Sequence, residues 1–503
     1  MSTDDPLLMR VDSSVEIGTG HAMRCLALAQ GWRDAHGRVS VVTAEMLPAV
    51  QERFEREGLE TIPLAVEPGS TADAAATAAL ARDRDAAWVA VDGYRFGGAY
   101  QETIRAGGSR LLVFDDYGHA GEYSADLVIN QNASASERLY RHRAPHTRLL
   151  LGPRYVVLQR TFRSRKPRED PPPAEARNLL VTMGGVDPKN ATGRVLRELE
   201  RAGLRGVRVQ VVAGSSHLHR SEVEAAATAS PLEVRVERDP PDMAEIMAEA
   251  DLAIAAAGTT SWELAYLGVP SLLLAVADNQ RDVAQSLDRA GAARSLGSYD
   301  GLTEDAIARA ARELAQAPTV RGEMSRRARA LVDGQGVPRV VTEMKALLVS
   351  LRPVRPEDAR ILFEWASDPD VRSVSFHPEA ISWDDHMRWF ATKREDPMCH
   401  FYLAADRREA PLGQIRFERS GADADVSVSL DTRFRGLGYG SALILAGSRK
   451  VFMDSDVRRL HAYIKVDNEP SVRAFRKAGY GHPERVTVNG QAALRLVLER
   501  EAL

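Results

Sequence analysis

Short apolar runs recur along the first 350 residues, and each is followed by a stretch with helical spacing. Before about Tyr155 the runs are LLMRV, VSVVT, AAWVAVDGY, RLLVFDD and ADLVIN. After it they are NLLVTMGG, VRVQVVAG, DLAIAAAG and PSLLLAV. Continuous apolar runs that alternate with helices are typical of strands buried in a parallel sheet. The pattern predicts two consecutive Rossmann-like lobes with a cleft between them.

Two changes of pattern predict domain boundaries. The stretch SRKPREDPPPAEAR is charged and proline-rich, so it can continue neither a helix nor a central strand and reads as a linker. At LRPVRPEDA the alternation gives way to two helices and then to antiparallel-looking strands, HFYLAAD, LGQIRFER and ADVSVSLD. We therefore predict an α/β protein with lobes at residues 1–160 and 161–348, followed by an α+β domain at 349–503.

Composition narrows the class of protein. The 503 residues exceed what one hydrophobic core usually organises. Basic and acidic residues nearly cancel to a net charge of -4, and Arg is spread along the chain, which argues against nucleic acid as a partner. The start, MSTDDPLLMR, has neither the basic residues nor the long apolar run of an export or membrane segment, so we expect a cytoplasmic protein and no membrane partner. Cys25 and Cys399 support neither a disulfide framework nor a thiolate metal site, and no metal is expected.

The first candidate site is the loop EIGTGHAMRCLALA, where a strand leads through Gly18 and Gly20 into a helix. Glycines in such a turn let backbone N–H groups approach an anionic or polyhydroxylated ligand. His21 stands at the helix start, where the positive end of the helix dipole disfavours imidazolium. A neutral imidazole can accept a proton, so His21 is a candidate general base, with a simple helix cap as the alternative.

The second candidate site lies in AGTTSWELAYLGVPSLLLAVADNQ. Gly258, Thr259, Thr260 and Ser261 open a helix and offer N–H and hydroxyl donors to a diphosphate. Glu263 lies in the first turn of that helix, where its carboxylate can accept hydrogen bonds from both hydroxyls of a ribose or can merely cap the helix.

These segments resemble a known family. The run GTT-x-x-E, then L-G-V-P and N-Q, resembles the UDP-binding signature of glycosyltransferase-B enzymes related to the N-acetylglucosaminyl transferase of peptidoglycan synthesis. Within that group, RVDSSVEIGTGHAMRCLALA, VDGYRF, DDYGHAGEYSADLVINQN, LGPRYVVL and VTMGGVDPKN resemble the UDP-2,4-diacetamido-2,4,6-trideoxy-β-L-altropyranose hydrolases of pseudaminic acid synthesis. The resemblance implies GT-B architecture, with His21 activating water, Gly258 to Ser261 holding the diphosphate and Glu263 holding the ribose. The other residues of the predicted UDP-sugar site are Gly18, Gly20, Arg24, Asn132, Gly184, Asn279 and Gln280. Further polar candidates near strand ends are Asp12, Tyr94, Asp115, Asp116 and Asn130.

The third domain carries a separate glycine-rich loop in TRFRGLGYGSALILAG. Its backbone N–H groups can hold a pyrophosphate at the helix start, and its residues are Arg435, Gly436, Gly438, Tyr439 and Gly440. With RLHAYIKVDNEPSVRAFRKAGY downstream, it resembles GNAT acetyltransferases. The resemblance implies acetyl-CoA as co-substrate, with Asn468 and the backbone of Leu430 at its site. Phe475 stands where many relatives have a tyrosine as general acid, and Tyr463 and Tyr480 are the unranked substitutes.

Together the resemblances predict a bifunctional enzyme. It would hydrolyse UDP-2,4-diacetamido-2,4,6-trideoxy-β-L-altropyranose and use acetyl-CoA to N-acetylate the UDP-4-amino-sugar precursor, so that one half makes the substrate of the other. Three alternatives stay open: a glycosyltransferase, in which an acceptor hydroxyl replaces water; the same activities on a spore-coat or legionaminic-type amino sugar; and a nucleotide-sugar sensor without turnover. The sequence defines neither the stereochemistry of the sugar nor the oligomeric state.

Overall fold

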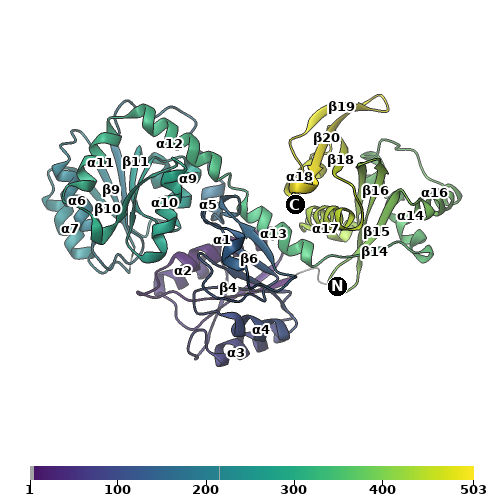
Figure 1. The fold of residues 1–503 in the computed structure, drawn as a ribbon, viewed down its shortest axis with the longest axis horizontal. Helices are drawn as coiled ribbons and strands as arrows, with labels where there is room; N and C mark the ends of the chain where they lie inside the picture. The colour runs from purple at the N-terminus through teal and green to yellow at the C-terminus, as the bar shows by residue number, and fades with distance from the viewer. Residues whose placement is uncertain (1–4, 215, 503) are drawn as a thin grey trace. The chain divides into compact units, whose positions relative to one another are not determined.

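The chain folds into two compact units. A computed structural model describes residues 5–214 and 216–502. The units are Asp5–Val337 and Pro338–Leu503, and each is considered by itself (Figure 1). The first contains two parallel sheets and the second a single mixed sheet. The fold class is therefore confirmed, whereas the predicted boundaries at 160/161 and 348/349 stay predictions.

The first lobe is a parallel sheet of seven strands in the order β3-β2-β1-β4-β5-β6-β7. Its strands are β1 (Pro6–Val11), β2 (Arg38–Thr43), β3 (Glu60–Pro63), β4 (Trp88–Asp92), β5 (Arg110–Phe114), β6 (Leu127–Asn130) and β7 (Arg148–Leu151). The flanking helices are α1 (Gly20–Asp34), α2 (Pro48–Arg56), α3 (Thr71–Asp83), α4 (Gly98–Ala106) and the short α5 (Arg160–Arg163). The apolar pattern predicted five of these strands and missed β3 and β7, because both are short strands at the sheet edges.

The second lobe is a parallel sheet of six strands in the order β10-β9-β8-β11-β12-β13. Its strands are β8 (Asn178–Thr182), β9 (Arg208–Ala213), β10 (Glu233–Arg238), β11 (Leu252–Ala256), β12 (Ser271–Ala275) and β13 (Arg294–Ser298). Its helices are α6 (Ala191–Arg201), α7 (Arg220–Ala229), α8 (Met243–Glu249), α9 (Thr260–Leu267), α10 (Arg281–Arg289), α11 (Ala306–Ala315) and α12 (Pro318–Leu331). Both faces of the sheet are covered, one by a core that includes α6 and α11 and the other by a core that includes α9 and α10.

Both parallel sheets have a topological switch point. In the first lobe it lies between β1 and β4, and in the second between β8 and β11. At such a point the connections leave the two neighbouring strands in opposite directions, so a crevice opens beyond their carboxyl ends. The loop that leads to His21 follows β1, and the loops that contain Gly184 and Gly258 follow β8 and β11.

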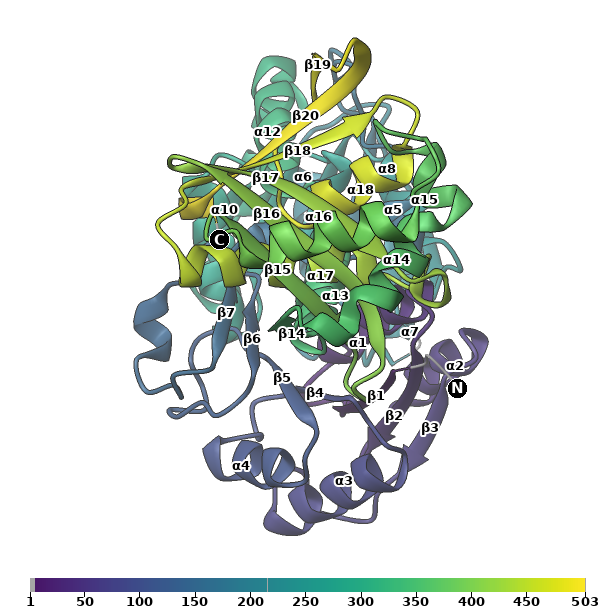
Figure 2. The same ribbon diagram turned by 90° about the vertical axis from the view of Figure 1, so that its right-hand side faces the viewer.

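The second unit includes most of α13 (Gly336–Leu347) and contains the sheet β14-β15-β16-β17-β18-β20-β19 (Figure 2). Its strands are β14 (Ser350–Pro353), β15 (Cys399–Ala405), β16 (Pro411–Ser420), β17 (Asp423–Leu430), β18 (Arg459–Lys465), β19 (Glu484–Val488) and β20 (Gln491–Glu499). The helices that follow α13 are α14 (Ala359–Ser367), α15 (Pro369–Ser373), α16 (Trp383–Glu395), α17 (Tyr439–Asp454) and α18 (Glu469–Lys477). The apolar core between α17 and the sheet is the larger of two, and α14 and α16 cover part of the opposite face.

A buried ion pair fixes α3 to the first sheet. Arg10 on β1 is 0% exposed, and its guanidinium donates to both carboxylate oxygens of Asp73 at 3.0 and 2.8 Å. Tyr100 on α4 donates to the same carboxylate at 3.0 Å. Asp12 is the second carboxylate partner of Arg10, so removing Asp73 leaves the buried guanidinium with one of its two carboxylates, which is costly.

We expect Asp73→Ala to lower the free energy of unfolding by about 3 kcal/mol or more, since Arg10 would stay buried without its main partner. The matched control is Glu60→Ala, which removes a partner of Arg84 at the surface and should cost about 1 kcal/mol or less. Urea unfolding of the full chain measures both values. Equal losses in the two variants would contradict this account of the buried pair.

Candidate active sites

His21 lies at the switch point of the first lobe, paired with an aspartate. It is the second residue of α1, directly after the loop that follows β1, and Asp92 ends the neighbouring strand β4. The His21 Nδ1 atom lies 2.6 Å from Asp92 Oδ1. Since the ionised carboxylate can only accept, the neutral imidazole carries its proton on Nδ1 and keeps the lone pair on Nε2. His21 is therefore a base with one defined accepting atom.

Asp92 belongs to a buried cluster that contains two carboxylates and one guanidinium. Arg24 donates through Nε and one terminal nitrogen to Asp92 at 2.7 and 2.8 Å. It also donates to Asp116 at 2.8 and 3.2 Å. Burial opposes ionisation of Asp92, but attraction by Arg24 and His21 outweighs it and holds the pKa of the carboxyl below its ordinary value. Burial also opposes ionisation of Asp116, but the attraction of Arg24 outweighs it and lowers the pKa of this carboxyl group strongly. Both carboxyl groups are ionised.

Tyr94 connects this cluster to the second lobe. Its hydroxyl donates to Asp116 at 2.9 Å and accepts from Asn279 Nδ2, also at 2.9 Å. Asn132, which was predicted to bind substrate, is 4% exposed and donates to the Asp116 side chain at 3.3 Å. Desolvation, which is the largest effect, and the Asp116 charge raise the pKa of Tyr94, so its phenol stays protonated. Asn279 therefore lies at the cleft edge facing the first lobe.

The predicted glycine loops of the two lobes face each other. A Cβ added to Gly20 would lie 3.6 Å from Thr259 Cγ2. Beside the exposed Gly184, a Cβ added to Gly185 would lie 3.2 Å from Thr19 Oγ1. The loop after β1 thus lies against the loops after β8 and β11, which brings the predicted base and the predicted diphosphate loop together.

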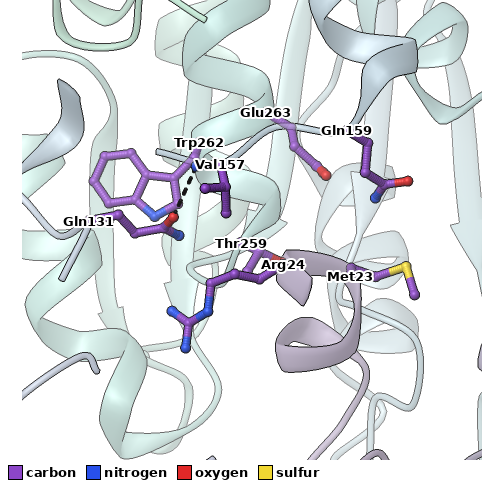
Figure 3. A pocket seen from close by; sticks show the side chains of 8 residues that line it. All are labelled: Met23, Arg24, Gln131, Val157, Gln159, Thr259, Trp262 and Glu263. Carbon is purple, nitrogen blue, oxygen red and sulfur yellow. Dashed lines mark hydrogen bonds between the residues drawn. The ribbon is translucent and has the colours of Figure 1, made fainter. Parts of the chain in front are cut away.

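A small pocket lies between α1 and the start of α9. Figure 3 shows Met23 and Arg24 of α1 lining it together with Thr259, Trp262 and Glu263 of the second lobe. Thr259 caps α9, and Thr260 is its first residue. Ser261 is 3% exposed, and the Gln280 side chain accepts from the Val276 N–H at 3.0 Å, so both are turned toward their own lobe.

Glu263 is a carboxyl group without a hydrogen-bond partner among the described residues. Burial raises its pKa to about 7, and the attraction of Arg53 opposes this only in part. A carboxylate at the start of a helix that lines a pocket, with no donor of its own, has both oxygens free to accept from a ligand. This is compatible with the predicted contact to a ribose.

The second unit contains a wedge between two parallel strands. β17 and β18 pair only at Asp423↔Arg459, Ala424↔Leu460 and Asp425↔His461. Beyond these pairs the strands continue to Leu430 and Lys465 without pairing to each other. The sheet is therefore split over the carboxyl halves of both strands. Leu430, the predicted backbone donor, lies at the open end of the wedge and pairs with Gly413 on the other side.

The glycine-rich loop lies between the wedge and α17. Gly436 and Gly438 have φ angles of +80° and +83°, and a Cβ on Gly436 would meet nothing within 4 Å. The loop thus leaves open space before the first turn of α17, where N–H groups are unpaired with the helix, and this suits a pyrophosphate. Tyr439 starts α17 with a buried side chain, so only its backbone can serve the site. Arg435 pairs with Asp370 at 3.0 Å, and Asn468 caps α18 through Ser471 at 3.2 Å.

The two tyrosines proposed as the general acid in place of Phe475 differ in burial and in the direction of their side chains. Tyr480 is 4% exposed, and its hydroxyl is 3.0 Å from Ser448 Oγ inside the core. Burial raises the pKa of Tyr480 far above its ordinary value. Tyr463 is only partly buried and lies on β18 two residues after the last pair with β17. Its neighbours Ala462 and Ile464 pack in the core with α17. Because successive side chains of a strand alternate, Tyr463 lies on the opposite face of the sheet.

Asp92 is the residue of the site that the sequence analysis missed. Its signal is present, because AAWVAVDGY predicts a buried strand that ends in a carboxylate. What the sequence lacks is the strand order, which places β4 beside β1 and so brings Asp92 to His21. Among the described residues no group of three or more His, Cys, Asp or Glu side chains is placed to hold a metal ion. Within the same residues no helix has the length and apolar character needed to span a membrane.

Comparison with known protein families finds one match in each unit. Residues 178–338 match the glycosyltransferase family 28 C-terminal domain, and residues 349–481 match the acetyltransferase (GNAT) domain. The chain thus joins a GT-B-like sugar enzyme to a GNAT domain, a class whose co-substrate is acetyl-CoA, as predicted.

Individual proteins add detail. The chain is 28% identical over 242 residues to the spore coat polysaccharide biosynthesis protein SpsG of Bacillus subtilis, a match that covers 48% of this chain and 70% of SpsG. It is 24% identical over 289 residues to the UDP-2,4-diacetamido-2,4,6-trideoxy-β-L-altropyranose hydrolase of Campylobacter jejuni, covering 57% of this chain and 97% of the hydrolase. MurG of Acinetobacter baumannii has a similar fold, with a TM-score of 0.50, 20% identity and coverage of 67% of this chain and 98% of that chain.

We expect Glu263→Gln to stabilise the unliganded protein at pH 8. An unfolded glutamate has a pKa of about 4.3, so the folded state with a pKa of about 7 binds more protons between these values. Stability therefore falls as pH rises through this window, and the full penalty applies above pH 7. The neutral variant should gain about 1 to 3 kcal/mol at pH 8 and almost nothing at pH 4. Chemical unfolding at both pH values measures the difference, and an equal effect at both would contradict the raised pKa.

Proposed function

We propose that the first unit hydrolyses a UDP-linked, N-acetylated amino sugar and that the second unit N-acetylates its 4-amino precursor with acetyl-CoA. The specific substrate we propose is UDP-2,4-diacetamido-2,4,6-trideoxy-β-L-altropyranose of pseudaminic acid synthesis. The observation that best supports hydrolysis is the 2.6 Å contact between His21 Nδ1 and Asp92 Oδ1, opposite the loop that starts α9. The hydrolase of Campylobacter jejuni, at 24% identity, supports the choice of substrate.

The chemistry of hydrolysis needs only groups that this cleft offers. His21 Nε2 takes a proton from water, and the water oxygen bonds to the anomeric carbon as the bond from that carbon to UDP breaks. The departing diphosphate carries the electron pair toward the loop Gly258–Ser261, where the N–H groups at the start of α9 and the helix dipole stabilise its charge. Glu263 accepts from the ribose hydroxyls and so orients the nucleotide. A single displacement of this kind inverts the anomeric configuration.

The chemistry of acetylation follows from the wedge. Acetyl-CoA supplies an activated acetyl group when it lies along the wedge with its pyrophosphate at Arg435–Gly440. An amine nitrogen bonds to the carbonyl carbon while the carbon–sulfur bond breaks, and Tyr463 would donate a proton to the thiolate. The amine must lose one proton, which returns the phenol to its neutral form.

A second candidate substrate is a related amino sugar of spore-coat polysaccharide. The 28% identity to SpsG, which exceeds the 24% identity to the Campylobacter hydrolase, favours it. The chemistry of the cleft is the same in both cases. Assays of release of UDP from a panel of UDP-amino sugars distinguish the two substrates.

We expect His21→Asn to lower sugar hydrolysis roughly 100-fold or more and to leave the Kd for UDP within about twofold, because only the base is removed. His36→Asn is the matched control, since His36 is exposed and lies at the far end of α1. UDP release measures turnover, and calorimetric titration measures binding. Hydrolysis that is retained in His21→Asn would exclude His21 as the base.

We expect Tyr463→Phe to lower acetylation about 10- to 100-fold near neutral pH, because the thiolate would leave without a proton donor. Tyr480→Phe should act on stability instead, since that hydroxyl contacts only Ser448 in the core. Thiol release from acetyl-CoA measures the rate, and thermal unfolding measures stability. A rate loss confined to Tyr480→Phe would reverse the assignment.

A further inference from the structure

The three charged side chains beside His21 are Arg24, Asp92 and Asp116, and their charges do not balance. Asp92 and Asp116 are both ionised, and Arg24 contributes the one positive charge among these three residues. With a neutral His21 the group carries one negative charge. When His21 accepts a proton, the group becomes neutral. The imidazolium that forms in the proposed reaction would therefore lie beside a carboxylate charge that Arg24 alone does not balance.

Arg24 has little capacity left for a ligand. A guanidinium has five N–H groups, and four of those of Arg24 are directed at Asp92 or Asp116. The residue is 5% exposed, and its guanidinium carbon Cζ lies 5.0 Å from the centroid of the Phe114 ring. This is the environment of a structural counter-ion. It differs from that of an arginine that waits for a diphosphate, because the donors of such an arginine would have to be free.

Asp92 is fixed more firmly than the histidine that it contacts. It is 1% exposed, it ends a central strand, and two nitrogens of Arg24 hold its carboxylate. The side chain of His21 is 11% exposed, whereas that of Asp92 is 0% exposed. A rigid acceptor beside a partly free imidazole sets the ring orientation and determines which nitrogen is protonated.

We propose that Asp92 is the positioning residue of the hydrolytic base and that Arg24 acts by holding Asp92 and Asp116, without binding the UDP-sugar. Asp92 keeps the proton on Nδ1, points Nε2 at the reacting water and balances the imidazolium that forms. Arg24 keeps the two carboxylates ionised and in place. The inference rests on the proposed function, because it concerns the base of the proposed hydrolysis.

A double-mutant cycle in the full chain tests the role of Asp92. We expect Asp92→Asn to lower kcat roughly 100-fold or more and to leave the Kd for UDP within about twofold. In the His21→Ala background the same substitution should change kcat less than about threefold, because a positioning residue acts only through the residue it positions. A residue that merely supports the fold would lower the rate in both backgrounds.

Two further variants complete the experiment. Asp126→Asn is the matched control, since Asp126 is also buried and paired with an arginine, Arg110, but lies in the loop before β6. It should lower stability and preserve kcat. Arg24→Lys, whose single ammonium cannot hold both carboxylates, should lower kcat at least tenfold while the KM for the UDP-sugar changes less than about threefold.

The outcomes distinguish failure of the proposed hydrolysis from failure of the roles given to Asp92 and Arg24. If His21→Ala leaves hydrolysis intact, the proposed function itself is wrong. If His21→Ala abolishes hydrolysis but Asp92→Asn does not, or if the two losses multiply, only the role given to Asp92 is wrong. If Arg24→Lys raises KM tenfold at unchanged kcat, Arg24 binds the substrate and the second half of the proposal is overturned.

Discussion

The hydrogen bond between His21 and Asp92 depends on the order of two strands in one sheet. His21 follows β1 and Asp92 ends β4, and these strands are neighbours only because the chain reverses its winding direction between them. The same reversal in the second lobe places the loops after β8 and β11 side by side. Each lobe therefore presents a crevice at its switch point, and the loops of the two crevices face each other across the cleft.

Charge is divided between the lobes in a way that suits the departure of a diphosphate. The first lobe places two ionised carboxylates and one guanidinium beside its base, so the imidazolium that forms in the proposed reaction has a carboxylate oxygen 2.6 Å away. The second lobe offers the N-terminus of α9, which favours a negative ligand. Glu263 is the exception, because it is a carboxyl group near that terminus whose pKa burial raises to about 7. Its cost to stability is understandable if its oxygens serve a ligand.

The sequence predicts much of this architecture and only part of the site. Continuous apolar runs revealed the central strands, while short or polar edge strands such as β3 and β10 gave no such signal. Glycines and the residues after them marked the loops at His21, Gly258 and Gly438, because turns have local signatures. Asp92 was missed, and Arg24 was predicted as a ligand although its donors are directed at two aspartates. Both depend on contacts between residues 68 or more positions apart, which no local pattern encodes.

The central claim is that water, activated in the cleft of the first unit, attacks the anomeric carbon of a UDP-amino sugar. The direct measurement is hydrolysis in water enriched in ¹⁸O, with the UDP-4-amino sugar and acetyl-CoA supplied together and the products followed by NMR and mass spectrometry. We predict acetylated free sugar that carries ¹⁸O at the anomeric carbon, first released with inverted configuration, and UDP without the label. Label in the phosphate of UDP, or release of UDP only when an acceptor alcohol is added, would contradict the account.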